Sequence, residues 1–321
     1  MSALAFTVVA LVLSGPVPAT LARASWPSRA PRAAIVLWQA IALAAVLSAF
    51  SAGIAIASRL FAPGRDGRPT ATVASEIDVF GWPLWIVYVA VFALTLVIGV
   101  RLAAAVVQVA IATRRRRAHH RMVVDLVGKS QKWGHSPRKG WAHPRAGDGL
   151  RILDVKEPLA YCLPGVRSRV VVSEGTLTTL ADNEIAAILS HERAHLRARH
   201  DLVLEMFTAV HAAFPRFVRS ASALGAVRLL IEMLADDAAL RATGPTPLAR
   251  ALVACAAGRT PVGALAAGGP TTVLRVRRLG GRGNSLVMAA AAYLAAAAVL
   301  AVPTVAVAVP WLTELHRLFT A

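Results

Sequence analysis

The sequence predicts an α-helical membrane protein that carries a small α+β domain. Three observations predict this fold class. Hydrophobic residues make up 56% of the 321 residues, several long runs contain no charged residue, and the sequence His191-Glu192-Arg193-Ala194-His195 lies between two of these runs. Soluble domains have about 45–50% apolar residues and no uncharged run long enough to cross a bilayer. We therefore expect membrane helices on both sides of a soluble insert.

Four hydrophobic segments are expected to cross the membrane as helices. At about 1.5 Å per residue, each can span roughly 30 Å of hydrocarbon. The first segment is weaker because Gly15, Pro16 and Pro18 interrupt it, and a cleaved signal peptide is the alternative to a retained span. The four expected spans cover about residues 2–21, 34–58, 84–113 and 286–309.

Basic residues near the span ends predict the orientation. The first loop holds Arg23, Arg29 and Arg32 without an acid, and the third span ends in the arginines 114–117. Cytoplasmic loops next to membrane spans are enriched in Lys and Arg. The first loop and the segment 114–285 are therefore expected in the cytoplasm, with the active site, and both chain termini outside it. The protein is then a multi-pass protein of the cell membrane, with the lipid bilayer as a partner.

These features divide the chain into three expected parts. Residues 1–113 hold three spans, 114–285 form the cytoplasmic domain with a basic juxtamembrane segment at 114–149, and 286–321 hold the fourth span and a short extracytoplasmic tail. The net charge is +18. We interpret the basic segment as an anchor on anionic headgroups. No direct nucleic-acid binding is expected, because a patch this close to a bilayer leaves little room for a duplex.

From Leu150 onward the sequence changes to short strands and helices. β-Branched runs between turn residues predict the strands, and apolar residues at helical spacing predict the helices. Asp182 or Thr179 is expected to cap the first helix, which carries the histidine motif. The expected strands cover 152–155, 159–163 and 169–173, and the expected helices about 182–200, 202–213 and 223–242.

The histidine motif predicts a zinc site. Residues four apart lie on one face of a helix, so His191 and His195 can bind one Zn²⁺. Glu192 projects about 100° away, where it can take a proton from the attacking water. The alternative is a pair of surface histidines on an amphipathic helix.

A catalytic zinc needs a third protein ligand, and the sequence leaves three candidates. His200 follows His195 closely but without the glycine of a three-histidine motif, and His211 lies on the next expected helix. Glu232 is favoured, because Asp236 follows one turn later on the same face. Asp236 can then hydrogen-bond the non-ligating nitrogen of a histidine.

The strand that contains Ala160, Tyr161 and Cys162 is a candidate docking edge for a substrate. An extended peptide can pair with an exposed strand edge through main-chain hydrogen bonds. An ordinary internal strand is the alternative of equal weight.

With these motifs, the segments 159–165, 169–180, 183–201 and 232–239 resemble the gluzincin core of integral-membrane metallopeptidases. Three spans before the domain and one after it make the chain similar to the BlaR/MecR-type antirepressor peptidases. Peptidases of the HtpX and CAAX-processing type share the Glu-x-x-x-Asp motif but arrange their spans differently. The resemblance implies a zinc-dependent endopeptidase in which His191, His195 and Glu232 bind the metal. It also implies that Glu192 is the catalytic base and that Asp236 supports a ligand.

The resemblance further implies a protein substrate, a winged-helix transcriptional repressor whose cleavage induces genes. The antibiotic sensors of this group carry an extracellular penicillin-binding domain after the last span, where this sequence has only residues 310–321. Direct sensing of β-lactams is therefore not expected. A membrane quality-control or processing protease and a non-catalytic membrane scaffold are the two other interpretations.

Overall fold

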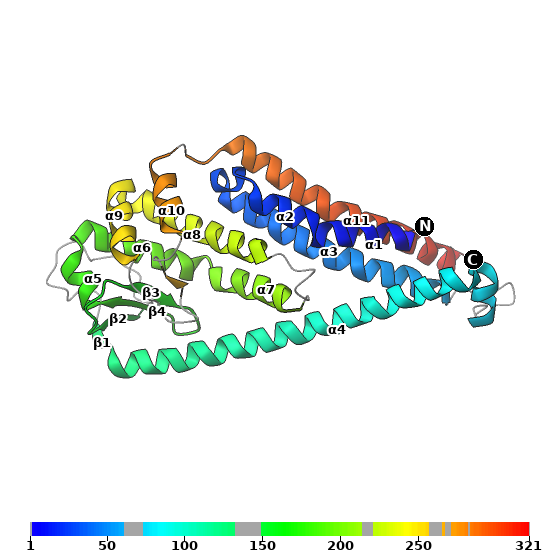
Figure 1. Ribbon diagram of the computed structural model, residues 1–321, viewed down its shortest axis with the longest axis horizontal. Helices are drawn as coiled ribbons and strands as arrows, with labels where there is room; N and C mark the ends of the chain where they lie inside the picture. Colours follow the sequence, from blue (N-terminus) through cyan, green and yellow to red (C-terminus); the bar gives the residue numbers. More distant parts are fainter. Residues whose placement is uncertain are drawn as a thin grey trace.

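The computed structural model describes residues 2–60, 73–131, 149–213, 221–256, 265–266, 271–281 and 283–320. Long apolar helices lie at one end of the molecule, and a small sheet with shorter helices lies at the other (Figure 1). The predicted fold class is confirmed, with four helices long and apolar enough to cross a membrane. These candidate spans are Ala5–Arg23, Pro31–Gly53, Gly81–Val127 and Leu286–Val305.

Helix α3 (Pro31–Leu60) is at the centre of the apolar helices. It packs against α1 (Ser2–Ser14), α4 (Val73–Val127) and α11 (Leu286–Thr320). Small side chains allow these close approaches, because Ala33, Ala34, Ala40 and Ala44 of α3 are all buried. The first span continues from α1 through Gly15 into α2 (Pro16–Arg23), and a short 3₁₀ helix, η1 (Trp26–Arg29), precedes α3.

Helix α4 is much longer than the third expected span. It contains 55 residues, with a break at Gly81 where φ is 73°. The helix continues beyond residue 113, where the span is expected to end, through the four arginines to Val127. Its apolar candidate segment has 47 residues, about 70 Å of helix, so its second half extends along the sheet domain (Figure 1). The rest of the basic segment holds strand β1 (Lys129–Gln131), and residues 132–148 lie outside the described residues.

The sheet contains the three predicted strands and two short additional ones. Its order is β1-β2-β4-β3-β5. Strands β2 and β4 are parallel, with Leu150 opposite Val170, and the other neighbouring pairs are antiparallel. The bounds are β2 (Gly149–Leu153), β3 (Ala160–Leu163), β4 (Arg169–Ser173) and β5 (Leu265–Ala266).

Both faces of the sheet are covered. Alternate strand residues point to opposite faces, so Ile152 and Val172 pack with Ile188 of α6 (Asp182–Arg197) and with α9 (Pro245–Cys255). On the other face, Tyr161 and Val171 pack against Val124 of α4. A helix that begins as a membrane span therefore forms part of the core of the domain.

The remaining helices are α5 (Glu174–Thr179), α7 (His200–Ala213), α8 (Ala221–Thr243) and α10 (Thr272–Leu279). The predicted cap of the motif helix is wrong, because Ala181 occupies the N-cap position of α6. Ala181 has no side-chain acceptor, and its own N–H donates to Glu184 Oε2 at 3.0 Å. The helix also ends at Arg197 and not near His200, because Arg199 has a positive φ of 52°.

We expect Gly175→Ala to destabilise the sheet domain. A Cβ at Gly175 would overlap the carbonyl group of Lys156, and such overpacking costs about 1–3 kcal/mol. Gly225→Ala is the matched control, because nothing lies within 4 Å of a Cβ there and helical Ala is favoured over Gly by about 0.5–1 kcal/mol. Thermal unfolding in detergent should show a lower midpoint for the first variant only; equal midpoints would contradict the close contact.

Candidate metal centre

The two histidines of the motif converge on α6. His191 and His195 are 0% exposed, and their Nε2 atoms lie 3.2 Å apart. The four-residue spacing places both rings on the same helix face, where they point toward α8. The alternative to a metal site was a pair of surface histidines. Both rings are buried, which excludes that alternative.

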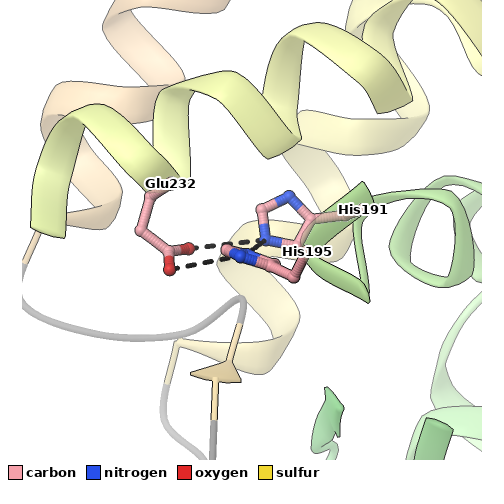
Figure 2. A group of neighbouring side chains, drawn as sticks. All are labelled: His191, His195 and Glu232. Carbon is pink, nitrogen blue, oxygen red and sulfur yellow. Dashed lines mark hydrogen bonds and ion pairs between the residues drawn. The ribbon is translucent and has the colours of Figure 1, made fainter. Parts of the chain in front are cut away.

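Glu232 of α8 completes a group of three (Figure 2). Its Oε2 lies 3.4 Å from His191 Nε2 and its Oε1 lies 3.6 Å from His195 Nε2. A tetrahedral ion with bonds of about 2.0–2.1 Å has ligand atoms about 3.3 Å apart. The observed separations fit such an ion. Within the described parts of the chain, the group that could hold a metal is His191, His195 and Glu232, without His200 or His211.

Asp236 lies one turn after Glu232 and contacts the other nitrogen of His191. Its Oδ1 is 3.0 Å from His191 Nδ1. Burial alone would lower the pKa of His191, but Asp236 and Glu232 outweigh it and raise this pKa to about 9. The carboxylates therefore make the centre favourable for positive charge, as a metal site requires.

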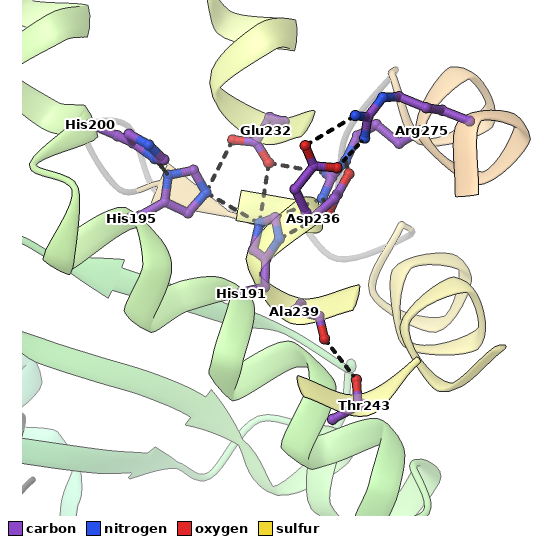
Figure 3. A network of polar contacts seen from close by, with 10 residues as sticks. His191, His195, His200, Glu232, Asp236, Ala239, Thr243 and Arg275 are labelled. Atoms are coloured by element: carbon purple, nitrogen blue, oxygen red, sulfur yellow. Dashed lines mark hydrogen bonds and ion pairs between the residues drawn. The ribbon is translucent and has the colours of Figure 1, made fainter. Parts of the chain in front are cut away.

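Arg275 of α10 is a residue of the site that sequence analysis missed. It is 1% exposed and donates to both oxygens of Asp236, from Nε at 2.8 Å and from Nη2 at 2.6 Å. Its Nη1 lies 3.1 Å from Glu232 Oε2, and Figure 3 shows the guanidinium beside both carboxylates. Burial alone would raise the pKa of Asp236, but Arg275 and His191 hold it well below its usual range.

A signal for Arg275 was present in the sequence. Within α10, Arg275 shares a helix face with Thr272 and Leu279, which pack toward the domain core. Arg275 is also one of several arginines just before the fourth expected span, and arginines at that position are commonly a sign of membrane orientation. An arginine on the apolar stripe of a short helix indicates a buried ion pair instead.

His200 supports the second histidine. It is the first residue of α7, and its Nδ1 lies 3.0 Å from His195 Nδ1. Burial lowers the pKa of His200 to about 4 and that of His195 to about 3, so both rings are neutral at pH 7. If His195 donates its Nδ1 proton to His200, its Nε2 keeps a free lone pair for a metal.

Glu192 lies next to the cluster on α6 and is 0% exposed. Burial, the largest cause, raises the pKa of its carboxyl to about 7. Its near neighbour is Cys162 of β3, a weak donor, and neither Glu192 oxygen has another hydrogen-bond partner among the described residues. The carboxylate therefore keeps acceptor positions free beside the three candidate ligands.

The candidate docking edge is not open in this structure. Ala160, Tyr161 and Cys162 are buried, and β3 is an internal strand between β4 and β5. Tyr161 pairs with Ala266 and Cys162 with Leu265, so β5 lies along that edge of β3. Of the two alternatives of equal weight, the described residues agree with the internal strand, and the sequence left both open because β5 comes from a segment about a hundred residues further along the chain.

We expect Arg275→Leu to lower the free energy of unfolding by about 3–5 kcal/mol, because it leaves buried carboxylates without their cation. Lys129→Gln is the control. The Lys129 side chain is 69% exposed in its pair with Glu174, and exposed pairs add little stability. Thermal unfolding of both variants in detergent measures the difference. An unchanged midpoint in Arg275→Leu would show that the buried pair does not stabilise the domain.

The comparisons with known proteins agree with this geometry. Residues 150–282 match the model of peptidase family M48, and the match contains every residue of the cluster and Arg275. No curated protein and no solved structure matches the chain. With the four candidate membrane helices, the match supports a membrane-associated metallopeptidase domain.

Proposed function

We propose that this chain is a membrane-bound, zinc-dependent endopeptidase. The observation that carries the proposal is the convergence of three ligand atoms, from two buried histidines and the partly buried Glu232, all within 4.8 Å of one another, beside the Glu192 carboxylate, which has no hydrogen-bond partner among the described residues. Two imidazoles and one carboxylate are a ligand set of zinc peptidases. The match to peptidase family M48 supports the same reaction class.

In this proposal, each residue of the centre has a defined role. His191, His195 and Glu232 hold the ion, which when bound polarises the scissile carbonyl and makes water a stronger nucleophile. Glu192 accepts the proton of the attacking water on its carboxylate and donates it to the leaving amine. Asp236 contacts Nδ1 of His191, and His200 contacts Nδ1 of His195. These two contacts fix the orientation of the metal-binding rings.

We further propose that the peptidase domain lies in the cytoplasm and both termini outside it, with the domain bounds 1–113, 114–285 and 286–321. Two hydrogen bonds of 2.7 Å connect the first loop to the domain side of the molecule: Arg278 Nε donates to Ser28 O, and Ser285 N donates to Arg29 O. The loop and the domain therefore share one side of the membrane. The arginines of that loop favour the cytoplasmic side.

The proposed substrate is a cytoplasmic protein. A winged-helix repressor is the first candidate, because the order of three spans, domain and one span resembles that of the BlaR/MecR-type peptidases. A quality-control or processing protease of the HtpX/CAAX type is the second candidate. Proteases of this type share the His-Glu-x-x-His motif that this chain has on α6 and the Glu-x-x-x-Asp motif that it has on α8. Neither candidate requires the chain to bind nucleic acid.

We expect about one zinc per purified chain, and its loss in His191→Ala, His195→Ala and Glu232→Ala. Glu192→Gln should keep the metal but lose roughly 10²–10⁴-fold in peptide hydrolysis, because it removes a general base and not a ligand. Glu157→Gln, at an exposed position, is the control for removal of an acid. Metal analysis and a peptidase assay provide the two readouts. Full metal content in Glu232→Ala would remove Glu232 from the ligand set, and loss of metal in Glu192→Gln would overturn its role as base.

Quantitative proteomics and transcript profiling of a Glu192→Gln strain under envelope stress should identify the substrate. If the chain cleaves a repressor, one DNA-binding protein accumulates and a compact set of genes fails to respond. Accumulation of many damaged membrane proteins with an unchanged transcriptome would support the quality-control role. A strain indistinguishable from wild type, with no zinc in the protein, would indicate a scaffold.

A further inference from the structure

A cavity lies between the first loop and the helices α8 and α10. Its volume is about 630 Å³, within the range of small-molecule sites, about 300–1,000 Å³. Its walls are mainly apolar, with Leu21 from α2, Leu230 and Met233 from α8, and Leu274 from α10. Helix α2 packs on α8 (Figure 1), and η1 also contacts α8. These contacts place the cavity where the first candidate span ends.

Two hydrogen-bond donors of the cavity lining have no acceptor. Trp38 is 2% exposed, and its Nε1 is buried without a hydrogen-bond partner among the described residues, as is Nε of Arg29. Both residues line the cavity. Buried donors in native proteins nearly always have partners, so two orphaned donors on residues that line one cavity favour a ligand that supplies acceptor oxygens.

The cavity also carries uncompensated positive charge. Arg29 and Arg277 line it, and neither forms an ion pair with any acid that the structure describes. Arg278, the neighbour of Arg277, differs because its Nη1 lies 2.6 Å from Asp237 Oδ1 and its Nη2 donates to Asn284 at 2.8 Å. Two cations therefore remain for an anionic ligand, while Arg278 has a structural role.

The position of the cavity identifies the source of this ligand. The candidate spans that end at Arg23 and begin at Pro31 and Leu286 meet near the cavity, so it lies at the boundary between hydrocarbon and water. Apolar walls beside cationic donors suit a molecule with acyl chains and a charged phosphate. A free phosphate ion would not need the apolar walls, and a zwitterionic lipid would not need two unpaired arginines.

We propose that this cavity binds an anionic phospholipid. Its phosphate and ester oxygens accept hydrogen bonds from Arg29, Arg277 and Trp38, and its acyl chain packs on Leu21 and the apolar face of α8. The site shares two helices with the metal centre, since Met233 follows Glu232 and Leu274 precedes Arg275. A lipid bound there holds α8 and α10 against the first loop.

The test uses full-length protein, delipidated in detergent, with phosphatidylglycerol as the anionic lipid and phosphatidylcholine as the neutral one. Native mass spectrometry and the shift of the unfolding midpoint measure binding. We expect phosphatidylglycerol to bind at least ten-fold more tightly than phosphatidylcholine. The double variant Arg29→Gln/Arg277→Gln should lose at least ten-fold of that affinity. Arg23→Gln/Arg32→Gln is the matched control, because it removes two exposed charges of the same loop that do not line the cavity.

Trp38→Phe provides a second, uncharged variant in case the double variant does not fold, and it should also weaken phosphatidylglycerol binding. Equal affinity for the two lipids, or equal loss in the cavity and control variants, would overturn the proposal. Glycerol 3-phosphate serves as the soluble probe. Binding of this probe as tight as that of phosphatidylglycerol would also overturn it, because the site would then recognise phosphate without a lipid.

Discussion

The carboxylate of Asp236 connects three helices of the peptidase domain. Asp236 belongs to α8, its Oδ1 lies 3.0 Å from His191 Nδ1 on α6, and both of its oxygens accept hydrogen bonds from Arg275 on α10. A buried carboxylate is stable only when such partners replace the water it has lost. The contact therefore restricts the positions of α6, α8 and α10, and Glu232, one turn earlier, reaches both histidine Nε2 atoms as a result.

A second set of contacts joins this unit to the membrane. Arg117 of α4 pairs with Asp201 at 3.0 Å, and Asp201 directly follows His200, the partner of His195. One turn later on α4, His120 Nε2 lies 3.0 Å from the Tyr161 hydroxyl. Helix α4 thus packs against both α7 and β3. The metal centre and the longest apolar helix belong to one packed assembly, so a domain cut away from α4 would lose part of its core.

The three strands, the motif helix and the helix of Glu232 and Asp236 could be predicted to within a few residues, because alternation and helical spacing are local properties. The four candidate spans followed in the same way from uncharged runs. The errors occur where local rules are incomplete. Helix α4 continues beyond the expected span because arginine is a good helix former, so charge ends a hydrophobic run without ending the helix. The cap of α6 was misplaced because the Glu184 side chain accepts the N–H of a residue without a capping side chain.

Residue order was sufficient to predict which side chains share a helix face, because His-Glu-x-x-His and Glu-x-x-x-Asp each place their members on one helix face. That these two faces meet, that Arg275 lies beside both carboxylates, and that β5 lies along the edge of β3 all depend on contacts between residues 37 to 105 positions apart. Helical spacing places Arg275 on the face of Leu279 and Arg277 on another face, but it does not show which face of α10 is buried. The packing of α10 against the domain core decides this, and Arg275 on the inner face meets the buried carboxylate of Asp236.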